Sequence, residues 1–322
     1  LDDRDGEIQK ATLDAHRYRL KHFVRWCDPN HIDNLKDLTG RDLQDYRYWR
    51  KNEGELKNVT LHTQMTTFRV FLKWAEDFHA VTPGLHEKVR VPKVDDGDDV
   101  ADRQVEPERA LEIMEYLDKF HYASRGHAIF RILFRTGVRT GGLRALDLAD
   151  YHSEEQYLEV AHRPETETPL KNGDGGERPI HLNAYTCQVL DDYIESHRKE
   201  VTDDHGRQPL ITSRYGRISR SGLRGQIYKF TQPCFYTREC PHGEDVDNCG
   251  MKGAVDDAGK CPSSEAPHAI RKGSITYWRA RNTPAEQVGE RADVNTDIIE
   301  KHYDKRADIN KMEQRRDLFN RE

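Results

Sequence analysis

The sequence predicts a mainly α protein with a small β-hairpin or sheet, in which a helical N-terminal domain is joined to an α-rich C-terminal domain. Three observations predict this fold class. Apolar residues recur every three or four positions through much of the chain, as they do on one face of a helix. An acidic stretch with little to bury interrupts that spacing near residue 93. Two short strand-like segments flank a glycine-rich turn and are the exception to the helical pattern.

The N-terminal domain is expected to span residues 1–92 and to fold as a small helical bundle over roughly 8–90. The first helix is expected over 12–27 with Thr12 as its N-cap, and the second is expected to begin after Thr39. The apolar spacing gives each of three helices an inner face. These faces comprise Leu20, Phe23, Val24 and Cys27 in the first helix, Leu43, Tyr46 and Trp49 in the second, and Leu61, Met65, Phe68, Leu72, Ala75 and Phe78 in the third.

Residues 93–105 predict a solvated acidic linker, because this segment holds an aspartate-rich run and few apolar side chains. A new helix is expected to begin near Pro107, since the fixed φ of proline suits a first helical position. Residues 106–322 are then expected to form a second, mostly helical domain.

The strand-like segments lie within this second domain. Residues 157–160 and 178–182 are rich in residues that favour extended structure, and the Gly-rich stretch 172–176 lies between them. We therefore expect the two segments to pair as neighbouring strands.

The composition describes a heavily charged, soluble protein, because 35% of the 322 residues are hydrophobic and 34% are charged. No run approaches the roughly 18 apolar residues of a membrane span, so no membrane partner is expected. The first residues are acidic rather than basic and then apolar, so they do not resemble a signal sequence. A cytoplasmic location is expected.

The formal net charge of −6 does not exclude a nucleic-acid partner, because affinity for phosphate depends on local clusters of lysine and arginine. Arginine outnumbers lysine by 33 to 18. Together with the acidic surplus, this balance fits either a protein adapted to high salt or an ordinary acidic protein. The charge balance alone decides nothing about function.

Four residues form a constellation suited to phosphodiester chemistry. Arg139 ends the segment Thr136-Gly137-Val138-Arg139, His268 and Arg271 form a His-x-x-Arg pair, and Tyr303 follows 32 positions after that pair's arginine. Arginines can neutralise phosphate oxygens because the guanidinium group stays charged and binds phosphate bidentately. His268 and Arg271, three residues apart on a helix, would face one phosphate. Tyr303 would attack phosphorus and conserve the bond energy in a phosphotyrosine.

Each of these residues also has an ordinary structural interpretation. An arginine after a helix-ending glycine is common, a His-x-x-Arg pair arises often by chance, and a late tyrosine is more often a packing residue. The complete set and its order, rather than any single member, favour catalysis.

The set and its order resemble the tyrosine recombinase (phage integrase) family, and the resemblance covers nearly the whole chain. It implies a helical, SAM-like core-binding domain in residues 1–92 and a catalytic domain in residues 106–322. It also implies a site-specific recombinase that cleaves and rejoins DNA through a 3′-phosphotyrosine at Tyr303 without a catalytic metal or cofactor. The implied partners are double-stranded DNA attachment sites and further copies of the chain, as a tetramer on DNA.

The resemblance adds one candidate and reveals two departures. Lys171 lies at the edge of the predicted turn, where the family keeps a mobile lysine that resembles a general acid, although an exposed turn lysine is the alternative. The acid that the family usually has three residues after the first arginine is replaced by Gly142. The family's histidine or tryptophan shortly before the tyrosine has no recognisable counterpart. Spacing indicates Val294, whereas motif shape indicates Glu290 or Arg291.

Four of the six cysteines lie in residues 234–261, a Cys-rich insert of the catalytic domain that is rich in Gly, Asp and Pro. Because the insert has few apolar residues to bury, a structural zinc ion would stabilise it. The expected ligands are Cys234, Cys240, Cys249 and Cys261, with His242 as an alternative ligand. Reduced cysteines and disulfides are the other interpretations, and disulfides are disfavoured in a cytoplasmic protein.

Cysteine-bearing inserts at this place resemble those of some archaeal integrases. That likeness agrees with the high-salt interpretation and with an archaeal virus or provirus as the source. The other two cysteines, Cys27 and Cys187, are expected to be core residues.

Two other functions remain open from the sequence. A type IB topoisomerase-like enzyme would use the same chemistry to relax DNA, and a non-catalytic DNA-binding regulator derived from a recombinase would explain Gly142. The tail 309–319 is amphipathic enough to dock on a neighbouring subunit, which would make placement of the nucleophile depend on assembly.

Overall fold

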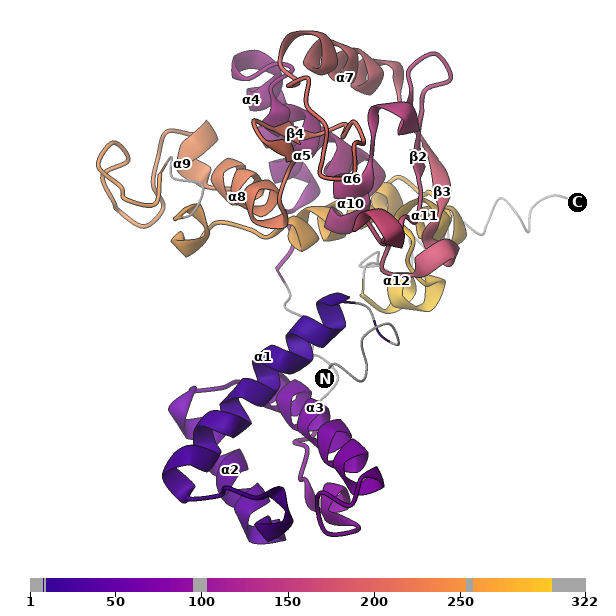
Figure 1. Ribbon diagram of the computed structural model, residues 1–322. Helices are drawn as coiled ribbons and strands as arrows, with labels where there is room; N and C mark the ends of the chain where they lie inside the picture. The colour runs from indigo at the N-terminus through magenta and orange to yellow at the C-terminus, as the bar shows by residue number, and fades with distance from the viewer. Residues whose placement is uncertain (1–7, 9, 95–102, 253–256, 303–322) are drawn as a thin grey trace, which may run out of the picture. The chain divides into compact units, whose positions relative to one another are not determined.

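The computed structural model describes residues 8, 10–94, 103–252 and 257–302, and Figure 1 shows its course. The chain divides into two compact units, residues 1–102 and 103–322. Helices make up most of the described structure, and the named strands are few and short. The mainly α fold class is therefore confirmed.

The first unit is built on three longer helices, α1 (Lys10–Cys27), α2 (Gly40–Glu53) and α3 (Asn58–Asp77). Short 3-10 helices accompany them, namely η2 (Asp28–Asn30), η3 (Leu35–Asp37) and η4 (Leu85–Lys88). The helix α2 begins directly after Thr39, as predicted, and Thr39 is its N-cap. Its hydroxyl accepts the N–H of Asp42, and the Asp42 carboxylate accepts the N–H of Thr39 at 2.8 Å, which satisfies two donors at the helix start.

Aromatic rings from all three helices form the core of the first unit. The ring of Phe68 on α3 lies 4.5 Å from that of Phe23 on α1 and 5.0 Å from that of Tyr46 on α2, measured between centroids. All three side chains are buried. The inner faces that the apolar spacing predicted for α2 and α3 therefore meet the face of α1.

Three details of the predicted bundle are wrong. The helix α1 begins at Lys10, so Thr12 lies inside it and does not cap it. Val24 and Phe78 are 60% and 62% exposed, although both were assigned to inner faces. Trp26 is buried on α1 instead of Val24, because the larger indole covers more apolar area in the aromatic core.

The second unit contains most of the elements. Its helices are α4 (Pro107–Phe120), α5 (Arg125–Thr136), α6 (Thr140–Ala145), α7 (Ala184–Ser196), α8 (Arg220–Phe230), α9 (Pro233–Tyr236), α10 (Pro267–Ala280), α11 (Ala285–Ala292) and α12 (Thr296–His302). Its strands are β1 (Tyr151–His152), β2 (Tyr157–Val160), β3 (Arg178–His181), β4 (Thr212–Ser213) and β5 (Gly216–Arg217). The 3-10 helices among its described residues are η5 (Leu148–Asp150), η6 (Pro164–Thr166), η7 (Gly173–Gly176) and η8 (Ala258–Lys260).

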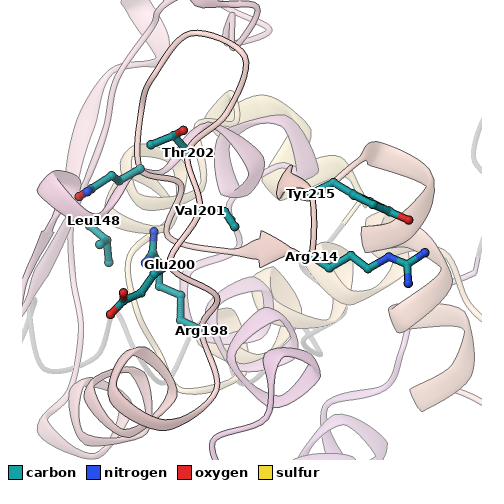
Figure 2. Close-up of a pocket in the computed structure, with 8 residues that line it drawn as sticks. Leu148, Arg198, Glu200, Val201, Thr202, Arg214 and Tyr215 are labelled. Carbon is teal, nitrogen blue, oxygen red and sulfur yellow. The ribbon is translucent and has the colours of Figure 1, made fainter.

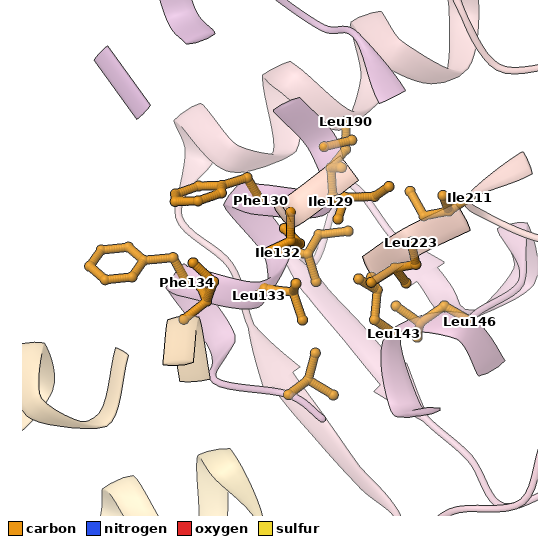
Figure 3. Close-up of a cluster of buried hydrophobic side chains, with 14 of the residues drawn as sticks. Ile129, Phe130, Ile132, Leu133, Phe134, Leu143, Leu146, Leu190, Ile211 and Leu223 are labelled. Atoms are coloured by element: carbon orange, nitrogen blue, oxygen red, sulfur yellow. The ribbon is translucent and has the colours of Figure 1, made fainter. Parts of the chain in front are cut away.

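The buried helix α5 organises the core of the second unit. Five of its side chains, Ile129, Phe130, Ile132, Leu133 and Phe134, are fully buried. Figure 3 shows them among apolar side chains of α6, α7 and α8. A helix that is apolar on several sides must be covered on several sides, and α5 packs against α4, α7, α8 and α10.

The predicted strands pair as expected. Strands β2 and β3 are antiparallel, with Leu158 opposite Ile180, and both side chains face the core. Strand β1 pairs with the other edge of β2, an addition that the sequence pattern did not indicate. The helix predicted near Pro107 begins at that residue.

The cysteines and the lengths of the helices can be stated for all described residues of the chain. Cys27 and Cys187 are buried, as expected, and all six cysteines are free thiols. Across the described residues, no helix combines the length and apolar character that crossing a membrane requires.

Candidate active site

The segment from Thr136 to Arg139 makes a sharp turn between α5 and α6. The buried Thr136 hydroxyl donates to the carbonyl of Ile132 at 2.6 Å and accepts the N–H of Val138 at 3.1 Å. Gly137 ends α5 with φ at 66°, a left-handed conformation that glycine adopts without steric cost. Arg139 then becomes the N-cap residue of α6, and its side chain is 28% exposed.

The Arg139 guanidinium forms an ion pair with the carboxylate of Asp293, the residue that caps the end of α11. The other carboxylate oxygen of Asp293 accepts a hydrogen bond from Asn172 Nδ2 at 2.7 Å. Asn172 is the neighbour of Lys171 in the chain. One carboxylate therefore joins the arginine of the first motif to the loop that carries the candidate lysine.

Arg271 lies beneath this group on α10 and is only 4% exposed. Its Nη1 donates to the carbonyl of Gly137 at 2.6 Å and to the carbonyl of Ala292, and its Nη2 donates to the carbonyl of Asp293 at 3.2 Å. Arg271 thus links the turn before Arg139 to the end of α11.

His268 is exposed on the first turn of α10. Although its side chain reaches solvent, the surrounding protein lowers its pKa, and the positive charges of four neighbours lower that pKa further. These neighbours are Arg271, Lys272, Lys171 and Arg139. The neutral form of the imidazole is therefore favoured at a point where cations from three segments of the chain lie nearby.

Lys171 is exposed beside η7, and within the described residues its side chain makes no hydrogen bond or ion pair. The backbone around it is anchored. The N–H of Leu170 donates to His162 Nδ1 at 2.8 Å, and Asn172 donates to Asp293. The loop is thus fixed on both sides of a lysine whose side chain faces solvent.

Arg178 and Arg291 attach the β2–β3 hairpin to α11, which lies beside it in Figure 1. Arg178 Nε donates to the carbonyl of Arg291 at 2.9 Å, and Arg291 Nη2 donates to the carbonyl of His181 at 2.8 Å. Burial, followed by the nearby charge of Arg178, lowers the pKa of Arg291 to about 10. Arg291 is therefore a packed structural residue.

None of the three candidate residues provides the histidine or tryptophan that the family has shortly before the tyrosine. Val294 packs against the apolar cluster of α10, α11 and α12, and Arg291 is occupied by backbone carbonyls. Glu290 is exposed. Tyr303 lies outside the described residues, as does the tail 309–319; α12 ends at His302, and its Ile299 is fully buried.

Asp293 is the residue that the sequence interpretation missed. It lies 154 positions from Arg139, and it follows no motif that predicts an acid at this point. The absence of an acid at Gly142 was the available signal, because it left Arg139 without a predicted partner.

The cysteines of the insert lie near one another without forming a recognisable metal site. Burial raises the pKa of the Cys234 thiol, and the neighbouring Cys240, Cys261 and Cys249 raise it further. No group of three or more His, Cys, Asp or Glu side chains in the described part of the chain is arranged to hold a metal ion. His242 instead lies 2.9 Å from the hydroxyl of Ser263.

A separate hollow on the second unit holds none of the candidate residues. Figure 2 shows it between the segment after α7 and the turn from β4 to β5, with Arg198, Glu200, Arg214 and Tyr215 among its lining residues. The Arg214 guanidinium lies 4.4 Å from the centroid of the exposed Tyr215 ring. This hollow is not part of the candidate active site.

Comparison with known proteins shows what the chain is similar to. Residues 4–78 match the model of the phage integrase N-terminal SAM-like domain. Over 207 residues the chain is 22% identical to the tyrosine recombinase XerD of Oceanobacillus iheyensis, a match that covers 62% of this chain and 67% of that protein. These matches support the tyrosine recombinase (phage integrase) family for this chain. The chain is a site-specific DNA recombinase.

Other matches agree with this assignment. The XerC tyrosine recombinase of Herpetosiphon aurantiacus is 22% identical over 66% of this chain and 66% of its own length, so the match spans about two thirds of each curated relative. The recombinase also has the fold of the Tn1549 transposon integrase in complex with transposon right end DNA (TM-score 0.65, 15% identity, 97% of this chain and 95% of that one). A lambda integrase dimer bound to a core site is similar (TM-score 0.60, 15% identity, 93% and 90%). The topoisomerase-like and regulator interpretations are not favoured.

Proposed function

We propose that this recombinase exchanges strands between double-stranded DNA attachment sites through Tyr303. The Tyr303 oxygen attacks phosphorus, forming a P–O bond to tyrosine while the bond from phosphorus to the 5′-oxygen breaks. His268, as a neutral imidazole, accepts the tyrosine proton, and Lys171 donates a proton to the leaving 5′-oxygen. Rejoining follows the same steps in reverse, with the 5′-hydroxyl of the partner strand as the attacking group.

Arg139 and Arg271 would neutralise the negative charge on the non-bridging phosphate oxygens during this reaction. Preorganised positive charge of this kind is usually the largest catalytic contribution. Arg139 is partly exposed and would contact the phosphate, whereas Arg271 would add its charge from within the protein. The observation that carries the proposal is that contacts through Asp293 hold Arg139, Arg271 and the loop of Lys171 together, with His268 within the influence of these three cations.

Plasmid recombination tests this proposal. The site is first recovered by selecting bound duplexes from a random-sequence pool, and two copies are then placed as direct repeats on one plasmid. The native protein is expected to delete the intervening DNA, and Tyr303→Phe is expected to bind but not delete. Relaxation of a plasmid with a single site, without deletion between two sites, would favour a topoisomerase-like enzyme. Binding without either reaction would favour a non-catalytic regulator.

We infer a division of labour between the two parts of the chain. Residues 1–92 would grip DNA as the core-binding domain, residues 93–105 would link the domains, and residues 106–322 would carry the catalytic groups. Four protomers would assemble on two sites, with the tail 309–319 docked on a neighbour. The chain would act in the cytoplasm, where DNA is available, and its charge balance supports an archaeal, high-salt source such as a virus or provirus.

We also propose that the Cys-rich insert 234–261 closes around a structural zinc ion. The support is the mutual influence of the four thiols on the pKa of Cys234 and the small number of apolar residues in the insert. Because the described side chains are not arranged for metal binding, zinc would have to draw the thiols together. The purified protein is expected to contain one zinc per chain by mass spectrometry. Removal of zinc by a chelator should lower the melting temperature. A purified protein without zinc, or a melting temperature that zinc removal leaves unchanged, would contradict the proposal.

A further inference from the structure

Asp293 contacts both arginines of the candidate site through different atoms. Its Oδ2 pairs with the Arg139 guanidinium, and its backbone carbonyl accepts from Arg271 Nη2 at 3.2 Å. The carboxylate is only 15% exposed, so water screens this ion pair less than it screens a pair on the open surface. No other acid has an ion pair with Arg139 among the described residues.

The backbone of Asp293 adopts a left-handed conformation that directs its side chain toward the candidate site. It has φ at 55° and ψ at 61°, in the left-handed region that aspartate and asparagine tolerate better than most residues. Its N–H caps α11 by bonding to the carbonyl of Glu290. This turn points the carboxylate back toward Arg139 and the loop of Asn172.

A carboxylate cannot readily reach Arg139 from the neighbouring turn of α6. Gly142, three residues after Arg139, is buried, and a Cβ at this position would lie 2.8 Å from Val138 Cγ2 and 3.5 Å from Val160 Cγ1. Val138 and Val160 are themselves buried. A side chain at 142 would require the branched side chain of Val138 to move, and the counter-charge of Arg139 comes instead from the end of α11.

The second carboxylate oxygen connects the same residue to the lysine loop. Asn172 donates to Asp293 Oδ1 at 2.7 Å, directly beside Lys171. The hairpin has other attachments to α11, because Arg178 donates to the carbonyl of Arg291 and Arg291 donates to the carbonyl of His181. Loss of the Asn172 contact would therefore loosen the lysine loop without detaching the hairpin.

We propose that Asp293 is a positioning residue that orients Arg139 for the scissile phosphate and keeps the Lys171 loop beside it. The inference rests on the proposed function of Arg139, Lys171 and Tyr303. It adds a link between three segments that the reaction must bring together: the turn before α6, the lysine loop and the helix end that leads toward the nucleophile. Asp293 itself would touch neither the phosphate nor the 5′-oxygen.

The test measures single-turnover formation of the covalent protein–DNA adduct on a nicked suicide duplex that carries the selected site. Asp293→Asn keeps the size and the left-handed preference of the residue but removes its charge. Its cleavage rate at saturating DNA is expected to fall on the order of 100-fold, as for misplacement of a reacting group by about 1 Å. The DNA affinity and melting temperature of Asp293→Asn should match those of the control variant Asp297→Asn. Asn172→Ala, which removes only the loop contact, is expected to have a smaller effect.

The matched control is Asp297→Asn, which removes the same charge from an exposed position on the first turn of α12. A positioning role also predicts non-additivity. In an Arg139→Lys background, where the guanidinium is already lost, Asp293→Asn should reduce the rate far less than in the native background. A purely structural role would give the same fold-loss in both backgrounds and would lower the melting temperature.

The outcomes separate this inference from the proposed function. A native rate in Asp293→Asn would overturn the positioning role alone. A faster rate would overturn it too, since it would mean that the carboxylate competes with phosphate for Arg139. Equal losses in both backgrounds would assign Asp293 to stability. If the native protein binds the duplex but forms no adduct, the proposed function fails and the inference falls with it.

Discussion

At His268, an imidazole with a lowered pKa lies near four cationic side chains, of which Arg139 is partly exposed and Arg271 is buried. Desolvation by the surrounding protein, followed by the charges of Arg271, Lys272, Lys171 and Arg139, lowers the pKa of His268 in the free protein below its ordinary value of about 6.5. A bound phosphate adds negative charge and favours the imidazolium, so the pKa of His268 should be higher in the DNA complex than in the free protein.

The sign of the pH dependence follows from this difference. Binding takes up a proton between the lowered pKa of free His268 and its higher pKa in the complex, so DNA affinity should increase as pH falls through that window. Above the window His268 is neutral in both states and contributes no pH dependence. The slope is expected to approach, at most, about tenfold per pH unit.

Fluorescence anisotropy across the pH range measures this effect. His268→Gln should flatten the added slope, whereas His197→Gln, at the exposed end of α7, should leave it unchanged. Equal slopes in the native protein and His268→Gln would contradict the placement of a phosphate beside this histidine.

Motifs in the sequence predicted Arg139, His268 and Arg271 because each lies in a short local pattern with fixed spacing. The structure places them near one another and near Lys171. Asp293 could not be predicted in the same way, because its contact with Arg139 joins residues 154 positions apart. A carboxylate recruited across the fold leaves no periodic or motif signal.

Among elements, the turn at Gly137 connects the buried helix α5 to the candidate site. Its φ of 66° suits glycine, and its carbonyl accepts from Arg271. A Cβ at this position would lie 3.2 Å from Ser274 Oγ and 3.3 Å from Ala292 Cβ. Gly137→Ala should therefore lower the free energy of unfolding by about 1–2 kcal/mol, the cost of the left-handed conformation, with crowding added.

Urea denaturation checks this prediction, and Gly141→Ala is its matched control. A Cβ at Gly141 meets nothing within 4 Å, and this residue lies inside α6 without a left-handed φ. Alanine there should be neutral or stabilise by about 0.5–1 kcal/mol. Equal free energies of unfolding for the two variants would contradict a requirement for glycine at position 137.

Helix starts and strand pairs that are marked by residues close together in the sequence were the easiest part of the fold to predict. The start of α2 after Thr39, the start of α4 at Pro107 and the pairing of β2 with β3 each had a signal in a short stretch of the sequence. Which side chains face inward depended on packing between helices. Trp26 displaced Val24 from the core of the first unit for that reason, and β1 gained its place by pairing with β2.

For the whole molecule, the proposed tail contact makes assembly separable from DNA binding. Truncation after about residue 306 removes residues 309–319 but keeps Tyr303 in the chain. The truncated protein is expected to bind a single site with native affinity and to lose cooperative assembly on paired sites. Gel shift and sedimentation on one-site and two-site duplexes measure both properties. Unchanged assembly would contradict a docking role for the tail.

The central claim is that Tyr303 forms a covalent link to DNA within the site of Arg139, Lys171, His268 and Arg271. Covalent trapping tests it most directly: the native protein and Tyr303→Phe are incubated with the nicked suicide duplex, separated on a denaturing gel, and the DNA-linked peptide is identified by mass spectrometry. We expect a DNA-linked band from the native protein alone, with the link on Tyr303. A band from both proteins, or no band from either despite confirmed binding, would contradict the claim.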